Sequence, residues 1–394
     1  MEKKITDNGL TIFLEGRIDT ANADDTEREA SEIRKEFPEG SLTFDVQKLE
    51  YISSAGLRLL MKFKKRERTL EIVNASPQVY DIFSMTGFTN ILTIKKALRK
   101  IDVSGLEVYG RVGQGIIYRL DSDTIVKVFS EGIPKEMIEA ELNKAKSAFL
   151  GGVPTTISYD MVDCGTNYGI VYETINAVSL SSAMNKADDA QLEGLISRYT
   201  EFIKEFQNMK SDFGEFENIK SVYHRNADML LKWADRDEVS VLHEIIDNIR
   251  ECETLLHGDP HPGNIILKDG EILFIDMTEI SKGPVIIDMS AVYRNLITSA
   301  RNTPDLCRKN TGLDPERAIK VGYRFFEQYT GISDSKKMEQ YMRSLGVVFA
   351  FNVCANIGFY ASFNDYARQQ APAVVENVLR KIVLPNKDLI EYML

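Results

Sequence analysis

The sequence predicts two folded units of different class, an α/β domain in the first hundred residues and a two-lobed α+β unit behind it. The chain has 394 residues, which is more than one hydrophobic core usually organises. In the first hundred residues short apolar stretches alternate with amphipathic ones, whereas the later residues place strands first and helices afterwards. Hydrophobic residues make up 43% of the chain and charged residues 27%, so we expect it to be folded nearly throughout.

The first hundred residues have the order β-α-β-α-β-α. Three segments have apolar residues at strand spacing, and each of them is followed by an amphipathic segment. In chain order the six segments are 10–14, 21–37, 42–46, 56–66, 70–73 and 77–86. Such alternation implies a mostly parallel sheet with helices packed on it.

A polar joint at 99–104 separates this domain from the rest of the chain. Sheet-like sequence at 106–129 is followed by a helix near 135–149 and a strand that begins at Gly169. Helical patterns then dominate, apart from short strands and turns at 254–287. Strands first and helices later, around a loop-rich middle, predict a two-lobed α+β unit.

Charge and composition exclude several classes of protein. The formal charge of −11 disfavours a nucleic-acid binder, and residues 1–99 hold 16 basic and 16 acidic side chains, so the excess acid lies in the second unit. No run of eighteen apolar residues occurs, and the first residues lack a secretory pattern, so we expect a cytoplasmic protein that does not enter a membrane. The four cysteines are far apart, as in proteins with reduced thiols.

The strongest motif lies between Leu255 and Asp276. It reads LLHGDPHPGN and continues, through an Asp-Gly turn, into a strand that ends in a second Asp. Phosphoryl transfer uses a carboxylate that orients and deprotonates the acceptor hydroxyl, together with an Asn and an Asp that hold Mg²⁺ on the nucleotide phosphates. A polar turn with chance Asp and Asn residues is the alternative.

This segment resembles the HGDxHxxN catalytic loop of aminoglycoside phosphotransferases and choline kinases, which have a protein-kinase-like fold. The resemblance implies that ATP and Mg²⁺ are the cofactors, that Asp259 is the catalytic base, and that Asn264 and Asp276 are the Mg²⁺ ligands.

Three further polar residues accompany the loop. Ile287-Asp288-Met289 resembles the second Asp element of the same family. We expect Asp288 to brace the loop by accepting backbone hydrogen bonds; a direct part in the chemistry is the alternative. His257 is expected to orient the loop, and His261 to pack within it, since no carboxylate with metal-ligand spacing accompanies it.

The nucleotide site is expected in the first lobe of the second unit. Gly110, Gly113 and Gly115 lie between two apolar strands, where the absence of Cβ atoms lets backbone N–H groups approach phosphates. The sequence after them remains strand-like, which favours a hairpin lid over ATP and argues against a dinucleotide-binding turn. Glu173 and Ile175 resemble the interlobe hinge, whose backbone would pair with adenine.

One lysine stands among apolar neighbours in the strand that follows the hairpin. Buried lysines are rare unless they are paired, so Lys127 resembles the kinase lysine that contacts the α- and β-phosphates. Its expected partner is a Glu on the next helix. Glu139 and Glu141 are the two candidates, and the spacing to the glycines at 151–152 favours Glu141.

The first unit carries a motif of its own. The segment from Phe44 to Arg58 reads FDVQKLEYISSAGLR, and together with the segment 73–88 it resembles the STAS domain of anti-sigma-factor antagonists. In that family a serine at this helix N-terminus is phosphorylated, and Ser54 occupies the matching position, preceded by Ser53 where many phosphorylated members have Asp. The alternative is that Ser54 only caps the helix.

These observations predict a STAS-like domain at 1–98 and a phosphotransferase at 102–394, with an N-lobe at about 102–173 and a C-lobe at about 176–394. The favoured function is phosphorylation of a small-molecule hydroxyl, with the STAS-like domain as a regulatory or homodimerisation module. A signalling kinase acting on a STAS serine, either Ser54 or a serine of an anti-sigma-type protein partner, is the second hypothesis. A nucleotide sensor with little turnover is the third. The sequence does not identify the acceptor.

Overall fold

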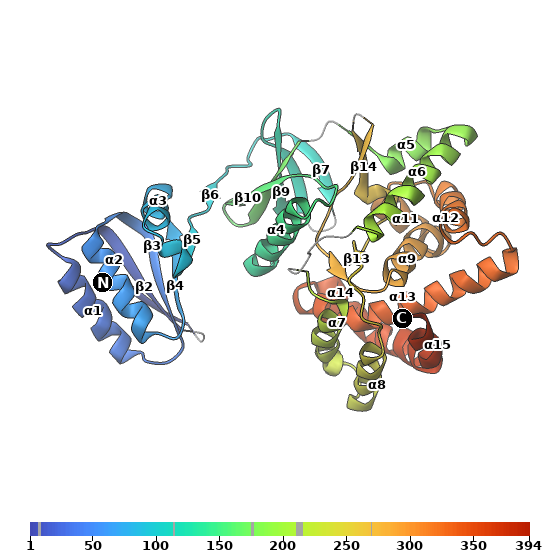
Figure 1. Cartoon of the computed structure of the whole chain (residues 1–394). Helices are drawn as coiled ribbons and strands as arrows, with labels where there is room; N and C mark the ends of the chain where they lie inside the picture. The colour runs from blue at the N-terminus through green and yellow to red at the C-terminus, as the bar shows by residue number, and fades with distance from the viewer. Residues whose placement is uncertain (7–8, 113–114, 175–176, 210–215, 269) are drawn as a thin grey trace. The chain divides into compact units, whose positions relative to one another are not determined.

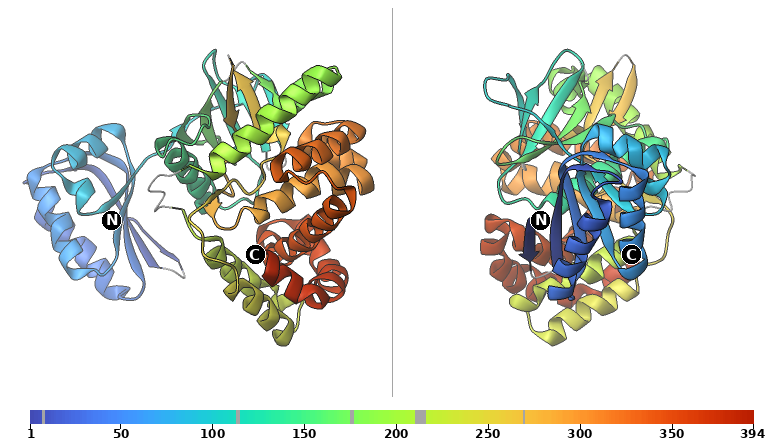
Figure 2. Two further views of the ribbon diagram at one scale, coloured as in Figure 1. Left: turned by 45° about the vertical axis from the view of Figure 1, so that its right-hand side comes forward. Right: turned by 90° about the vertical axis from the view of Figure 1, so that its left-hand side faces the viewer.

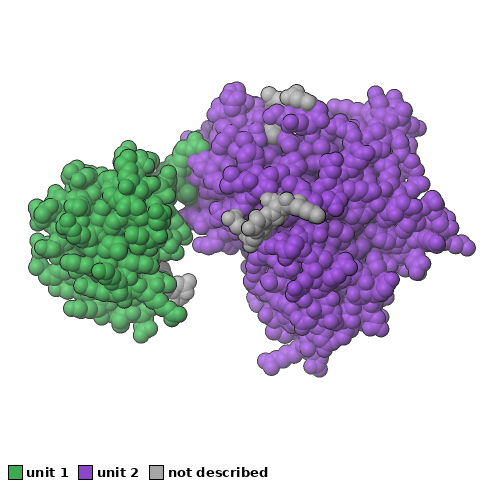
Figure 3. Space-filling model, viewed as in Figure 1, with its two compact units in different colours: residues 1–100 green, residues 101–394 purple. Residues whose placement is uncertain are grey.

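The computed structural model of the chain describes residues 1–394 except 7–8, 113–114, 175–176, 210–215 and 269. The chain divides into two compact units, Met1–Lys100 and Ile101–Leu394 (Figure 3). Two of the residues predicted for the nucleotide site, Gly113 and Ile175, lie outside the described residues.

Unit 1 is an α/β domain, as predicted. Its five strands follow one another in the sheet, the first pair antiparallel and the others parallel. They are β1 (Lys3–Thr6), β2 (Gly9–Ile18), β3 (Ser41–Ile52), β4 (Leu70–Ala75) and β5 (Thr93–Lys96). The sequence pattern predicted the three central strands but neither β1 nor β5, because these short edge strands have too few buried positions to alternate.

Three helices and a 3₁₀ turn complete unit 1: α1 (Ala23–Glu36), α2 (Ser54–Arg66), α3 (Pro77–Met85) and η1 (Phe88–Asn90). The core lies between these helices and the sheet. Phe44 of β3 and Phe63 of α2 are almost fully buried there, with ring centroids 5.1 Å apart in an edge-to-face arrangement.

Unit 2 begins with an antiparallel sheet in the order β10-β11-β9-β8-β7, preceded in the chain by β6 (Arg99–Lys100). Its strands are β7 (Val108–Val112), β8 (Gly115–Arg119), β9 (Thr124–Phe129), β10 (Ser158–Asp163) and β11 (Tyr168–Glu173). The helix α4 (Lys135–Leu150) follows β9 and packs on β10 and β11. This sheet holds the hairpin and the lysine strand of the predicted nucleotide site.

Short strands connect this sheet to the helices. β12 (Val178–Ser179) pairs with β14 (Ile265–Lys268), which pairs with β15 (Glu271–Phe274). β13 (Leu255–Leu256) pairs with β16 (Ser281–Lys282). The loop 257–264, which includes the 3₁₀ turn η3 (Pro262–Asn264), therefore runs between two paired strands that fix both of its ends.

Helices form the rest of unit 2 (Figures 1 and 2). In each view the strands β7–β11 and the last helices lie at opposite ends of this unit. The helices are α5 (Leu180–Lys186), α6 (Asp189–Gln207), α7 (Ile219–Ala227), η2 (Asp228–Lys232), α8 (Arg236–Asp247), α9 (Ile286–Tyr293), the π-helical turn η4 (Arg294–Thr298), α10 (Ser299–Asn302), α11 (Pro304–Thr311), α12 (Pro315–Thr330), α13 (Ser335–Phe363), α14 (Asp365–Val374), the π-helix η5 (Val375–Val383), η6 (Leu384–Asn386) and α15 (Lys387–Met393).

Among the described helices, α13 alone is long and apolar enough to cross a membrane. Half of its most apolar window is buried inside unit 2, where it packs against α7, α9, α14 and η5. A core helix passes the same test of length and composition, so α13 is weak support for a membrane segment.

Candidate functional site

A lysine–glutamate pair connects the sheet of unit 2 to helix α4. The Nζ of Lys127 in β9 lies 2.7 Å from Oε1 of Glu141, and the two residues are only 9% and 5% exposed. The hydroxyl of Tyr172 donates to the same carboxylate oxygen at 3.1 Å. Burial alone would lower the pKa of Lys127, but the charges of Glu141 and Asp276 outweigh it and raise that pKa. Glu139 instead faces the surface, where its carboxylate lies 3.7 Å from Lys135.

Asp288 of α9 holds the loop after β13 through two hydrogen bonds. Its two carboxylate oxygens accept the backbone N–H groups of His257 and Gly258 at 3.0 and 2.8 Å. Asp288 is fully buried, and burial raises its pKa to about 7 against the two N–H groups that lower it.

Gly258 must be glycine for two reasons. Its φ is +89°, and a Cβ atom there would lie 2.4 Å from Cβ of Glu279. The His257 ring beside it is buried; it packs on Phe274 and its Nε2 lies 3.2 Å from the carbonyl of Ile275. Burial lowers the pKa of His257 to about 4, so the ring is neutral near pH 7.

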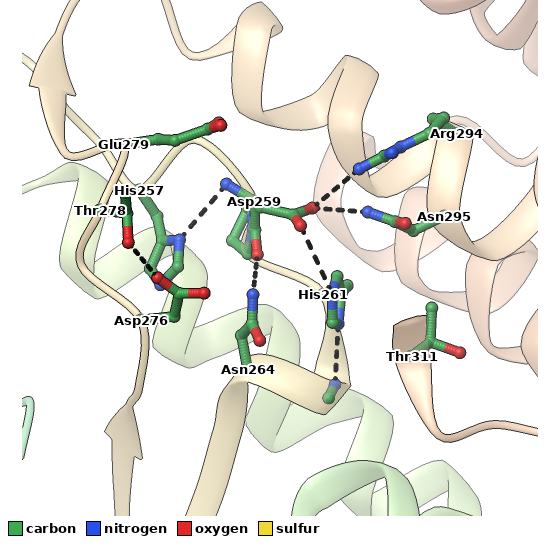
Figure 4. A network of polar contacts seen from close by, with 12 residues as sticks. His257, Asp259, His261, Asn264, Asp276, Thr278, Glu279, Arg294, Asn295 and Thr311 are labelled. Carbon is green, nitrogen blue, oxygen red and sulfur yellow. Dashed lines mark hydrogen bonds and ion pairs between the residues drawn. The ribbon is translucent and has the colours of Figure 1, made fainter. Parts of the chain in front are cut away.

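Asp259 points into a cluster of polar side chains (Figure 4). Its Oδ1 accepts a hydrogen bond of 2.6 Å from the side-chain amide of Asn295 and lies 3.3 Å from the guanidinium of Arg294. Its Oδ2 lies 3.5 Å from Nε2 of His261, and His261 in turn accepts from the backbone N–H of Gly263 at 3.0 Å. His261 is buried, so it packs within the loop and also contacts the carboxylate.

The π-helical turn η4 explains how two consecutive residues reach one oxygen. In a regular α-helix neighbouring side chains point in directions about 100° apart. Arg294 and Asn295 occupy the first two positions of η4, where the helix widens, and both side chains turn to Asp259. Arg294 also lies over the ring of Phe349, with its carbon Cζ 5.3 Å from the centroid.

Asn264 and Asp276 are placed on the other side of Asp259 (Figure 4). The Nδ2 of Asn264 donates to the carbonyl of Asp259 at 3.0 Å, which fixes the amide and leaves its oxygen as an acceptor. Asp276 has a φ of +64°, a strained conformation for a residue other than glycine, and accepts from the hydroxyl of Thr278. Loss of solvation alone would raise the pKa of Asp276, but the charge of Lys127 and the hydrogen bond from Thr278 outweigh it and lower that pKa.

Several of these side chains, but not that of Asn264, line one small cleft of about 220 Å³. Its lining joins the hairpin, the lysine strand and the loop: Val112, Lys127, His257, Asp259, Asp276, Thr278 and Glu279. Residues separated by up to 167 positions in the sequence therefore face one space that contains one cation and three carboxylates.

The glycines of the hairpin differ in what surrounds them. Gly110 in β7 has open space, since a Cβ there would meet only a side-chain carbon of Ile117 at 4.0 Å. A Cβ on Gly115 would lie 2.1 Å from the carbonyl oxygen of Val128, so the close approach of β8 to β9 already requires this glycine. At the hinge, the backbone N–H of Glu173 bonds to the carbonyl of Ile157 and its side chain accepts from the N–H of Ile157.

The two serines of unit 1 have different roles at α2. Ser53 is the N-cap, with its Oγ accepting the N–H of Ala55 at 3.2 Å. Ser54 is the first helical residue and is exposed. The alternative in which Ser54 only caps the helix is therefore wrong.

Sequence reasoning missed Arg294, Asn295, Thr278 and Glu279 as neighbours of the cleft. A polar Arg-Asn pair in the otherwise apolar stretch 286–300 was the available signal, but helical periodicity does not predict a π-turn.

The fold and this cleft are those of a kinase-type phosphotransferase joined to a small α/β domain, and the family comparisons agree. Residues 117–317 match the phosphotransferase enzyme family, and residues 1–101 match the STAS domain. The chain therefore belongs to the phosphotransferase enzyme family and carries an N-terminal STAS domain. The resemblance to both families is confirmed.

Individual relatives are of two kinds. A putative anti-sigma factor antagonist, BtrV of Bordetella bronchiseptica, is 32% identical over 93 residues, which are 22% of this chain and 78% of the relative. Among solved structures, the gentamicin complex of APH(2'')-IIa is 13% identical and covers 73% of this chain and 93% of its own, with a TM-score of 0.47. A choline/ethanolamine kinase family protein from Mesorhizobium loti is 12% identical over 74% of this chain and 93% of its own, with a TM-score of 0.41.

Proposed function

We propose that the protein transfers the γ-phosphoryl group of ATP, with Mg²⁺, to a hydroxyl group of a small molecule. The observation that carries this proposal is the convergence of the Lys127–Glu141 pair, Asp259 and Asp276 on one cleft in a chain of the phosphotransferase enzyme family. We further propose that the transferase comprises residues 102–394, with lobes at about 102–173 and 176–394, that the STAS domain comprises residues 1–98, and that the protein is cytoplasmic.

Lys127 would hold the α- and β-phosphates of the nucleotide. Glu141 keeps its ammonium group in the cleft, and the hydroxyl of Tyr172 keeps Glu141 in place. The hairpin that contains Gly110, Gly113 and Gly115 would cover the phosphates, and the segment from Glu173 to Ile175 would lie at the adenine. The close approach of β9 already requires glycine at 115, so of the two described glycines of the hairpin only Gly110 has the open space that phosphate binding needs.

Mg²⁺ fits Asp276, which lines the cleft, and Asn264, which is bonded to Asp259. It prefers oxygen ligands and is usually held by one or two carboxylates together with substrate phosphates. Asp276 offers a carboxylate with a lowered pKa, and Asn264 offers an amide oxygen whose orientation is fixed by its bond to Asp259. Nucleotide phosphates would supply the other ligands. When bound, the ion would neutralise charge on the phosphates.

Asp259 would orient the acceptor hydroxyl and take its proton. Because Asn295 and Arg294 both hold Oδ1, the less engaged Oδ2 is the oxygen available to the acceptor. His257 and Asp288 keep the loop in shape, since both are buried and bond to the loop backbone.

A second candidate function is phosphorylation of a serine in a partner-switching system. The similarity of unit 1 to an anti-sigma factor antagonist and the exposed Ser54 at the start of α2 favour it. The acceptor would then be Ser54 itself or a serine of a STAS-domain or anti-sigma-type partner, with homodimerisation through the STAS domain as one arrangement.

One experiment separates the two candidates. The full chain is incubated with Mg²⁺ and γ-labelled ATP, first alone and then with pools of alcohols, sugars, aminoglycosides and amino acids. Label in a small molecule supports the first function, and label on Ser54, absent in Ser54→Ala, supports the second. If no label is transferred and Mg·ATP does not raise the melting temperature, both candidates are wrong.

A further inference from the structure

A second, larger cavity adjoins the cleft. It has a volume of about 250 Å³ and lies among α4, α7, α13 and the segment after β15. Thr278 and Glu279 line both spaces, and Gly258, the residue before Asp259, lines the cavity. A small molecule in the cavity can therefore extend a hydroxyl group toward Asp259.

Two charged side chains in the wall of this cavity form no ion pair with a described residue. Glu141 is paired with Lys127, and Glu217 forms two hydrogen bonds with Arg225 at 2.9 and 3.0 Å. One carboxylate and one ammonium group remain. Among the described residues Glu279 has no ion-pair partner within 4.0 Å and accepts from the hydroxyl of Tyr360. Lys144 likewise forms no ion pair with a described residue, and its Nζ donates to the carbonyl of Thr278 at 2.9 Å.

Uncharged polar groups surround these two charges. Asn226, Asn352 and Asn356 form a chain of side-chain hydrogen bonds at 2.7 and 2.6 Å along the cavity. The hydroxyls of Tyr223 and Ser281 are buried in its wall and have no partner among the described residues. Buried polar groups are almost always satisfied, so the hydroxyls of Tyr223 and Ser281 are available to polar groups of a bound molecule. Apolar side chains, among them Ile219, Val222 and Phe359, complete the lining and would pack on its carbon atoms.

We propose that the cavity binds the acceptor, and that the acceptor is a small zwitterionic alcohol of the hydroxy-amino acid class. Its ammonium group lies at Glu279, its carboxylate lies at Lys144, and its hydroxyl reaches Asp259. In the transfer, the hydroxyl oxygen forms a bond to the γ-phosphorus, the bond from that phosphorus to the bridging oxygen of ADP breaks, and the hydroxyl proton passes to Asp259. This inference rests on the proposed phosphotransferase function.

The size of the cavity supports a small acceptor. Sites for drug-sized ligands usually measure about 300–1,000 Å³, so 250 Å³ is too small to enclose a molecule of several rings. The charges of Glu217 and Glu279 act on Lys144, but it forms no ion pair with either of them. An amino alcohol would pair only with Glu279 and a hydroxy acid only with Lys144, whereas a zwitterion pairs with both groups at once.

Three matched probes test the proposal with the full chain and Mg·ATP. L-homoserine carries both charged groups, 3-aminopropan-1-ol lacks only the carboxylate, and 4-hydroxybutyrate lacks only the amine. L-serine, glycerol and kanamycin are added to vary length, charge and size. We expect kcat/KM to be highest for one of the two hydroxy-amino acids and at least about tenfold lower for each probe that lacks a charge.

Two variants assign the charges. Glu279→Gln should lower kcat/KM about tenfold or more for probes with an amine and leave 4-hydroxybutyrate nearly unchanged. Lys144→Met should do the reverse, affecting the probes with a carboxylate and sparing 3-aminopropan-1-ol. Lys146→Met, on the same helix but outside the cavity lining, is the control and should match the wild type. An unchanged rise in melting temperature with Mg·ATP shows that each variant is folded.

A preference for glycerol, kanamycin or 3-aminopropan-1-ol would overturn the zwitterion proposal and leave the phosphotransferase function intact. The same holds if Mg·ATP stabilises the protein but neither hydroxy-amino acid is phosphorylated. Loss of both nucleotide stabilisation and transfer to every acceptor would instead contradict the proposed function.

Discussion

The side-chain amide of Asn295 donates a 2.6 Å hydrogen bond to Oδ1 of Asp259. Asn295 is almost fully buried at the second position of a π-helical turn, and Arg294 before it reaches the same oxygen. The helices thus hold Oδ1 of this carboxylate, and Oδ2 is the oxygen left for the proposed acceptor.

We expect Asn295→Ala to lower kcat about 10- to 100-fold and to leave the KM for ATP unchanged, because the amide positions the carboxylate without contacting the nucleotide. Steady-state kinetics with saturating ATP measure this. Asn377→Ala is a suitable control, since Asn377 lies in η5 and, among the described residues, its side chain bonds only to Lys381 at the surface. A rise in the KM for ATP with unchanged kcat would show that Asn295 supports nucleotide binding.

The two glutamates of α4 form a matched pair for a second prediction. Glu141→Ala leaves the buried ammonium of Lys127 without its partner, so we expect weaker ATP binding and a loss of stability of about 3–5 kcal/mol. Glu139→Ala removes only a surface contact of 3.7 Å and should change stability by less than about 1 kcal/mol. Urea unfolding and nucleotide titration of both variants check this, and equal effects would contradict the assignment of Glu141.

Asp288 predicts a specific dependence of stability on pH. An acid whose pKa rises on folding binds more protons in the folded state, so its contribution to stability falls as pH increases from its ordinary value of 3.8 to about 7. Asp288→Asn lacks this titration and leaves a backbone N–H unsatisfied.

The stability advantage of the wild type over Asp288→Asn should therefore be largest near about pH 4.5 and smaller near about pH 7.5. Urea unfolding of both proteins at the two pH values gives the difference. An advantage that grows with pH would mean that Asp288 is ionised throughout this range in the folded protein.

Substitutions of Ser53 and Ser54 distinguish helix capping from phosphorylation. Ser53→Ala removes the cap of α2 and should cost about 1 kcal/mol of stability in unit 1, whereas Ser54→Ala should cost almost nothing. Thermal unfolding distinguishes them. If Ser54 is a phosphorylation site, Ser54→Ala alone abolishes labelling, and a larger loss of stability in Ser54→Ala than in Ser53→Ala would contradict the capping geometry.

Much of the architecture could be predicted from the sequence because it depends on local patterns. The alternation of strand and helix periods predicted the α/β class of unit 1, and the loop from His257 to Asn264 has a spacing that few unrelated sequences share. The sequence left two glutamates as possible partners of Lys127. Which face of α4 packs against the strand depends on tertiary contacts that the periodicity of the sequence does not encode. The geometry places Glu141 beside it.

The residues that surround Asp259 from the helices could not be predicted in the same way. Arg294 and Asn295 converge on Asp259 at a π-helical turn, and the position of Glu279 requires a glycine at 258, since a Cβ there would lie 2.4 Å from Cβ of Glu279. Both features arise from tertiary packing. Whether Ser53 or Ser54 caps α2 depends on which of the two begins the helix, and sequence patterns do not resolve helix ends to one residue.

The most direct test compares Asp259→Asn with Asp276→Asn in the transfer of label from γ-labelled ATP to the best acceptor. Both residues line the cleft, but in the proposed reaction Asp259 acts on the acceptor, whereas Asp276, whose charge acts on Lys127, holds Mg²⁺. The two substitutions should therefore affect different steps. We predict that Asp259→Asn lowers kcat at least about 1,000-fold with an almost unchanged Kd for Mg·ATP, and that Asp276→Asn weakens Mg·ATP binding. Equal loss of nucleotide binding in both variants, or full transfer activity in Asp259→Asn, would contradict the proposed roles.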